Sequence, residues 1–124
     1  MKKILVVDDE KDIRDLIREV LTDDKFSVIT AAGGEEALAL AKTDKPDLIL
    51  LDIAMPKMDG YITCEKLKGD PETKGIPVIF LTGKDFDTKS AIERSKNLGA
   101  AGYVSKMTSM KELLEHVKVI LFRL

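Results

Sequence analysis

The chain has 124 residues, of which 44% are hydrophobic and 34% are charged, with one cysteine and no tryptophan. Its 20 Lys and Arg residues against 22 Asp and Glu residues give a formal charge of −2, which argues against a nucleic-acid-binding domain. The single Cys64 excludes an internal disulfide, and no apolar stretch approaches the roughly 20 residues of a membrane span. We therefore expect one soluble, cytoplasmic domain over residues 1–124, either a complete protein or part of a longer one.

Short apolar segments alternate with helical patterns along the whole chain. Three of these segments are continuous in Val, Ile and Leu, which is typical of parallel strands buried on both faces. The predicted strands cover residues 4–7, 26–30, 48–51, 78–81 and 102–104. Apolar residues at helical spacing predict helices over residues 13–21, 35–42, 61–67, 91–98 and 110–121. Five β-α units with short connections predict an α/β fold with a doubly wound parallel sheet.

Chemically active side chains stand where the predicted strands end. Asp8-Asp9-Glu10 follow the first strand, and Asp52, Thr82 and Lys106 lie at or just beyond the ends of three others. In an open parallel sheet these ends meet at one edge. Clustered carboxylates need a compensating cation, and Mg²⁺ prefers oxygen ligands. A lysine and a hydroxyl suit phosphoryl oxygens, so we predict a Mg²⁺-dependent phosphoryl site with a carboxylate as candidate acceptor.

Each of these residues also has an ordinary structural interpretation. Asp9 or Glu10 would cap the helix that follows, and Asp52 would be a hydrogen-bonded turn aspartate ahead of Met55-Pro56. Tyr103 would be a half-buried aromatic of a short strand. The conjunction of carboxylates, hydroxyl and lysine at one sheet edge favours the functional interpretation over these separate ones.

Four segments together resemble the receiver domain of response regulators, in particular the stand-alone chemotaxis type. They are ILVVDD at residues 4–9, DIAMPKMDG at 52–60, PVIFLTG at 77–83 and GYVSK at 102–106. Each motif alone is weak, but their order and spacing are specific, and the resemblance covers the whole chain. It implies a flavodoxin-like (βα)5 fold with the strand order 2-1-3-4-5, which is known for the chemotaxis regulator.

The resemblance also implies a role for each matching residue of the sheet edge. Asp52 would accept a phosphoryl group from the phosphohistidine of a histidine kinase. Asp9, Asp52 and the backbone carbonyl of Ala54 would bind Mg²⁺ directly, and Asp8 would bind it through water. In this family such a domain is a phosphoacceptor that assists its own phosphorylation and dephosphorylation, and it is not classed as an enzyme.

The resemblance implies that three further residues bind the phosphoryl group or change conformation when it binds. Thr82 and Lys106 would contact phosphoryl oxygens, and Tyr103 would rotate inward as Thr82 moves. This rotation would reshape the face formed by residues 91–98, 102–104 and 110–121. Val119 lies on the polar side of the last predicted helix with Phe122 on its flank, and we predict that this face binds a partner or a second copy.

The implied partners are a histidine kinase or phosphotransfer protein and a downstream protein or effector domain, without direct nucleic-acid or membrane contact. Two other functions remain open: an aspartate-nucleophile phosphohydrolase and a phosphorylation-independent interaction module. One residue departs from the family pattern, because Met107 stands where receivers usually have a proline. A cis bond before a non-proline residue costs roughly 2.5–4 kcal/mol, so we predict a trans Lys106–Met107 peptide. Lys84 is a further candidate for phosphoryl contact.

Overall fold

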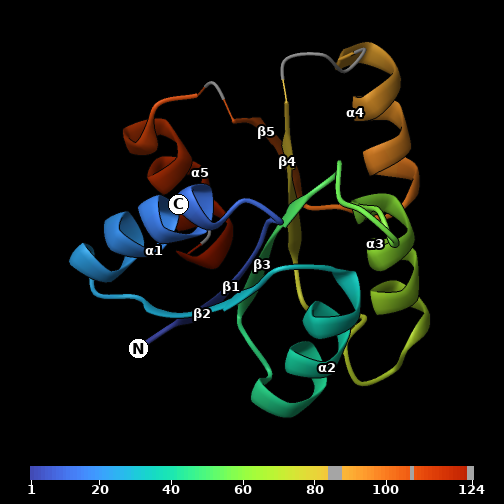
Figure 1. The fold of residues 1–124 in the computed structure, drawn as a ribbon, viewed down its shortest axis with the longest axis horizontal. Coiled ribbons are helices and arrows are strands. Elements are labelled where there is room, and N and C mark those ends of the chain that lie inside the picture. Colours follow the sequence, from blue (N-terminus) through green and yellow to red (C-terminus); the bar gives the residue numbers. More distant parts are fainter. Residues whose placement is uncertain (84–87, 107, 123–124) are drawn as a thin grey trace.

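Five parallel strands form the centre of the fold (Figure 1). The computed structural model describes residues 1–83, 88–106 and 108–122. The strands are β1 (Lys3–Val7), β2 (Ser27–Ala31), β3 (Leu48–Asp52), β4 (Val78–Thr82) and β5 (Gly102–Ser105). They are hydrogen-bonded in the order β2-β1-β3-β4-β5, and every neighbouring pair is parallel. Both the predicted fold class and the predicted strand order are confirmed.

Helices cover both faces of the sheet. They are α1 (Lys11–Asp23), α2 (Gly34–Asp44), α3 (Gly60–Gly69), α4 (Thr88–Asn97) and α5 (Met110–Phe122). Figure 1 shows α1 and α5 on one face and α2, α3 and α4 on the other. None of the helices in the described ranges is long and apolar enough to cross a bilayer.

The alternation of side chains along each strand divides the core into two apolar clusters. In β1, Leu5 belongs to the cluster on the α2–α3 side, whereas Ile4 and Val6 belong to the cluster on the α1–α5 side. All three side chains are fully buried. A strand covered on both faces therefore needs apolar residues at consecutive positions, which explains the continuous runs in the sequence.

The chain ends α1 with a turn that shifts the start of β2. The amide of Phe26 donates to the carbonyl of Leu21 at 3.1 Å, and Lys25 adopts the left-handed backbone region at φ 73°. Phe26 thereby completes the helix end, and β2 begins and ends one residue later than the predicted 26–30. Its ring joins the core cluster between α1 and α5.

The start of α3 and the end of α4 follow the sequence signals closely. The Asp59 carboxylate accepts from the Ile62 amide at 2.8 Å and caps α3. Gly99 lies at φ 80° just beyond α4, and its amide donates to the Lys96 carbonyl at 3.0 Å. At Gly60 a Cβ atom would overlap the carbonyl oxygen of Asp52, so only glycine lets α3 begin this close to β3.

Candidate functional site

Two carboxylates and a lysine from three strand ends meet at the carboxyl edge of the sheet. The Lys106 Nζ atom lies 2.7 Å from Asp8 Oδ2 and 3.2 Å from Asp52 Oδ2. Both carboxylates are buried, and the lysine side chain is 17% exposed. The parallel strands place these three residues together because β1, β3 and β5 all end at this edge. The structure therefore brings together these three residues, as the strand ends predicted.

The backbone around Asp8 holds its carboxylate in place. The Asp8 Oδ1 atom accepts from the Glu10 amide at 2.9 Å, and the Asp8 amide donates to the Ala31 carbonyl at 3.2 Å. Arg14 donates from Nη1 to the Asp8 carbonyl at 2.8 Å. Glu10 precedes α1 but makes no side-chain cap. The expectation that the Glu10 side chain caps α1 is therefore wrong. The carboxylate that accepts a backbone amide at this turn is that of Asp8.

Burial and a neighbouring carboxylate raise the pKa of Asp52 against the effect of Lys106. Burial, followed by the charge of Asp8, raises the pKa of Asp52 to about 7, although Lys106 counteracts this rise. Burial alone lowers the pKa of Lys106, but the neighbouring Asp8 and Asp52 outweigh that effect and raise it. The lysine therefore carries a charge that two buried carboxylates share, and one cation does not neutralise both of them.

The acidic side chains next to this pair offer oxygen ligands for a cation. Carboxylate oxygens of Asp8, Asp9 and Glu10 all lie within 4.8 Å of one another, and Asp9 and Glu10 are exposed. In the described part of the chain, Asp8 Oδ2 and Asp52 Oδ2 are buried, and the partner of both oxygens is the Lys106 ammonium group. These oxygens fit a hard divalent ion such as Mg²⁺. Sequence reasoning gave Glu10 no ligand role, although it directly follows the Asp8-Asp9 pair.

Thr82 and Ser105 end the neighbouring strands β4 and β5 and face each other in register. Thr82 is buried, and its Oγ1 donates to the Gly83 carbonyl at 3.2 Å. The Lys106 amide donates to the Thr82 carbonyl at 2.8 Å, which joins the lysine to the end of β4. Ala54 lies two residues beyond β3, in the connection to α3. Lys84, Met107 and therefore the Lys106–Met107 peptide lie outside the described residues.

Tyr103 is turned toward the apolar cluster between the sheet and α3. Its ring packs against that cluster, which includes Tyr61 and Phe80. The Tyr103 Oη atom is buried and has no hydrogen-bond partner within the described ranges. A buried hydroxyl without a partner is unfavourable, so this position of the ring is held by packing and not by a hydrogen bond.

The two exposed apolar residues of α5 lie on different flanks of the helix. Val119 is 49% exposed and lines a shallow cavity of about 440 Å³ with Glu112, Glu115 and His116. Phe122 is 48% exposed and stacks on Phe26 at 6.3 Å between ring centroids. Phe122 thus belongs to the α1 flank, and the surface expected around both residues is divided.

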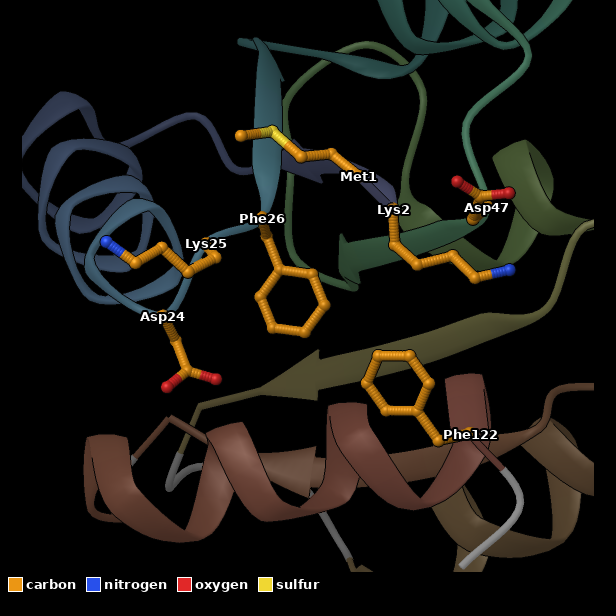
Figure 2. Close-up of a pocket in the computed structure, with 7 residues that line it drawn as sticks. All are labelled: Met1, Lys2, Asp24, Lys25, Phe26, Asp47 and Phe122. Atoms are coloured by element: carbon orange, nitrogen blue, oxygen red, sulfur yellow. The ribbon is translucent and has the colours of Figure 1, made fainter.

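A second cavity of about 520 Å³ lies at the opposite, amino-terminal edge of the sheet (Figure 2). It is lined by Met1, Lys2, Asp24, Lys25, Phe26, Asp47 and Phe122. Asp24 already pairs with Lys118 at 2.8 Å, and Asp47 accepts from the Lys3 amide at 2.8 Å. This cavity contains none of the strand-end residues at the carboxyl edge, so it is separate from the candidate phosphoryl site.

Comparison with known proteins gives a consistent result. The family model of the response regulator receiver domain matches residues 4–118. The alkaline phosphatase synthesis transcriptional regulatory protein PhoP of Bacillus subtilis is 45% identical over 124 residues, covering 98% of this chain and 49% of PhoP. The response regulator PleD of Caulobacter vibrioides is 51% identical over 84 residues, covering 67% of this chain and 18% of PleD. The chain spans about half the length of most of the curated relatives it matches.

Solved structures agree along almost the whole chain. The chemotaxis protein CheY4 of Vibrio cholerae has a TM-score of 0.89 at 31% identity and covers 98% of this chain and 99% of its own. A CheY-like response regulator receiver domain protein of Methanospirillum hungatei has a TM-score of 0.89 at 32% identity, covering 99% of this chain and 95% of its own. The similarity therefore extends to the three-dimensional arrangement that surrounds the candidate site.

Proposed function

The chain belongs to the response regulator receiver family, and from this premise we propose that it is a phosphoryl-accepting signalling switch with Asp52 as the acceptor. One observation carries the proposal: Asp52 is a buried carboxylate that shares a single lysine with Asp8, at an edge where further carboxylates stand ready for a cation. The donor is the phosphohistidine of a histidine kinase or phosphotransfer protein, and the exchange takes place in the cytoplasm.

The transfer forms a bond between an Asp52 carboxylate oxygen and phosphorus and breaks the bond between phosphorus and the donor imidazole nitrogen. Asp9, Asp52 and the Ala54 carbonyl would hold Mg²⁺ directly, and Asp8 would hold it through water. A bound Mg²⁺ supplies the charge neutralisation that lets an anionic phosphoryl group approach the carboxylates. Lys106 then turns from the carboxylates to the phosphoryl oxygens, to which its ammonium group is suited.

The signal leaves the site through Thr82 and Tyr103. Thr82 Oγ1 turns from the Gly83 carbonyl, which it contacts at 3.2 Å, and donates to a phosphoryl oxygen. Tyr103 follows, and the surface formed by α4, β5 and α5 changes for a downstream protein, an effector domain or a second copy of the chain. Val119 is the exposed apolar residue of α5 that belongs to this surface. Phosphorylation shifts an existing equilibrium by its differential affinity for the two conformations.

Incubation with acetyl phosphate and Mg²⁺, followed by intact mass measurement, tests the proposal. We expect one added phosphoryl group on the wild type, no labelling of Asp52→Asn, and normal labelling of the exposed control Asp23→Asn. Labelling that survives in Asp52→Asn would refute the assignment of the acceptor. Repeated turnover of a phosphate ester would favour a phosphohydrolase, and a wild type that takes no label with Mg²⁺ bound would favour an interaction module.

A further inference from the structure

An exposed arginine of α4 lies over a buried tyrosine of α3. The Arg94 Cζ atom is 4.0 Å from the centroid of the Tyr61 ring, well within the range of a cation–π interaction. Tyr61 is 7% exposed and packs against Phe80 with 5.5 Å between ring centroids. Figure 1 shows α3 and α4 on the same face of the sheet. The contact therefore ties two helices together through an aromatic ring that is part of the core.

This tie matters because α4 contributes little bulk to the core. The buried side chains among the described residues of α4 are Ala91 and Ser95. Ser95 donates to the Ala91 carbonyl of its own helix at 2.7 Å, so its hydroxyl does not bind α4 to the rest of the protein. A helix that buries such small side chains gains little from apolar packing, so the contact of Arg94 with Tyr61 adds to a modest apolar attachment.

Tyr61 directly follows a glycine that packs on the backbone of the acceptor residue. The preceding Gly60 donates its amide to the Ile53 carbonyl at 2.8 Å and packs directly on the Asp52 carbonyl. The same ring lies near Tyr103 in one apolar cluster. Arg94, Tyr61 and Tyr103 thus join α4, α3 and β5 at one junction, one residue away from the backbone contact with Asp52.

Tyr103 has space on its other side. A cavity of about 210 Å³ between α4 and β5 is lined in part by Ile92, Ser95, Lys96 and Tyr103. The Tyr103 hydroxyl is buried without a hydrogen-bond partner in the described chain, so the inward position carries a cost that packing must offset, and α4 lines the cavity next to it.

We propose that Arg94 is a latch whose stacking on Tyr61 holds α4 against the sheet and favours the inward position of Tyr103 over an outward one. Arg94 is a positioning residue, because it acts on Tyr103 through Tyr61 and touches none of the site residues. The consequence for signalling rests on the function proposed above: the latch sets how much of the chain is inward before a phosphoryl group arrives. Phosphorylation then changes the population of inward Tyr103 by a smaller amount.

The composition of the chain makes the latch directly observable. Tyr61 and Tyr103 are the only two tyrosines of the sequence, so labelling with 3-fluorotyrosine gives two ¹⁹F resonances, and Tyr103→Phe assigns them. Arg94→Met removes the cation above the ring, and Lys89→Met removes another exposed cation of the same helix as the matched control. We expect Arg94→Met to shift both resonances and Lys89→Met to leave both unchanged.

The expected size follows from the strength of an exposed cation–π contact. Its loss should lower the ratio of inward to outward Tyr103 about two- to fivefold, with Arg94→Lys between the wild type and Arg94→Met. The latch is refuted if Arg94→Met shifts only Tyr61, or if Lys89→Met moves Tyr103 as much as Arg94→Met does. Far-ultraviolet circular dichroism of each variant confirms that the comparison is made on folded protein.

A second arm separates the latch from the proposed function. Acetyl phosphate and Mg²⁺ are added to the labelled wild type and Arg94→Met, and intact mass gives the phosphorylated fraction of each. We expect a larger change of the Tyr103 resonance in Arg94→Met, because more of its population starts outward. An equal or smaller change at equal phosphorylation would overturn the latch as a regulator. A wild type that gains no phosphoryl group contradicts the proposed function. The comparison of Arg94→Met with the wild type in the absence of acetyl phosphate still tests the latch.

Discussion

The charge of Asp52 should destabilise the folded, metal-free protein, and removing it should stabilise that protein in a pH-dependent way. Burial and the charge of Asp8 raise the pKa of Asp52 from 3.8 to about 7. Between these two pH values the folded chain binds more protons at this site than the unfolded chain does. The contribution of Asp52 to the free energy of unfolding therefore falls as pH rises from about 4 to about 7, and the cost is fully present above pH 7.

The size of this effect follows from the same two pKa values. A rise from 3.8 to about 7 corresponds to at most about 4 kcal/mol. The Asp52→Asn substitution removes this cost but also takes away a partner that lies 3.2 Å from Lys106 Nζ. Lys106 retains Asp8 at 2.7 Å, so we expect a net gain of about 1–3 kcal/mol at pH 8. The gain should shrink toward pH 5, where the wild-type carboxyl is protonated.

Urea unfolding in the presence of a chelator, at pH 5, 7 and 8.5, measures this prediction. The quantity compared is the difference in the free energy of unfolding between Asp52→Asn and the wild type at each pH. Asp23→Asn, an exposed position of α1, serves as the control and should show no comparable trend with pH. A difference that stays constant from pH 5 to pH 8.5, or that grows toward pH 5, would refute the electrostatic account of this site.

Three further predictions test the metal, the backbone and the output surface. Mg²⁺ at 100 times its dissociation constant should stabilise the wild type by about 2.7 kcal/mol. The Asp9→Asn variant should need a higher Mg²⁺ concentration for the same rise in melting temperature. An unchanged Mg²⁺ titration would count against Asp9 as a ligand. Gly60→Ala should destabilise by about 1–3 kcal/mol through its overlap with the Asp52 carbonyl, whereas Gly69→Ala, whose Cβ meets nothing within 4 Å, should not. Val119→Lys should change stability by less than about 0.5 kcal/mol yet weaken self-association or partner binding after phosphorylation, as measured by sedimentation velocity; equal association would exclude this surface.

The fold was predictable because its signals are local and repeated. The continuous apolar runs, the helical spacing between them, and Asp59-Gly60 at the start of α3 all act within a few residues, and each agrees with the structure. Strand ends of a parallel sheet necessarily meet at one edge, so the meeting of Asp8, Asp52 and Lys106 also followed from the chain order. The shift of β2 by one residue was not predictable, because it depends on how Phe26 closes the turn after α1.

The contact partner of a long side chain was not predictable from the spacing of residues in the sequence. Helical periodicity placed Phe122 on the flank of α5, but only the packed structure brings its ring onto Phe26. Arg94 is one of several cations on α4 in the sequence, and nothing local distinguishes it from Lys96. Its position over Tyr61 depends on how α4 lies against α3, which is a relation between segments more than 30 residues apart.

The proposed switch would draw on the same burial that stabilises the fold. Apolar strands on both sides keep water away from Asp8 and Asp52 and so strengthen every charge interaction between them. A lone lysine leaves excess negative charge, and the chain carries this as a destabilising contribution. A divalent cation would neutralise this charge, and the removal of the destabilising contribution would add to the free energy of its binding. On the proposed function, Lys106 and Thr82 would exchange their contacts with Asp8 and Gly83 for phosphoryl oxygens, so a change confined to one carboxylate would alter the ends of both β4 and β5.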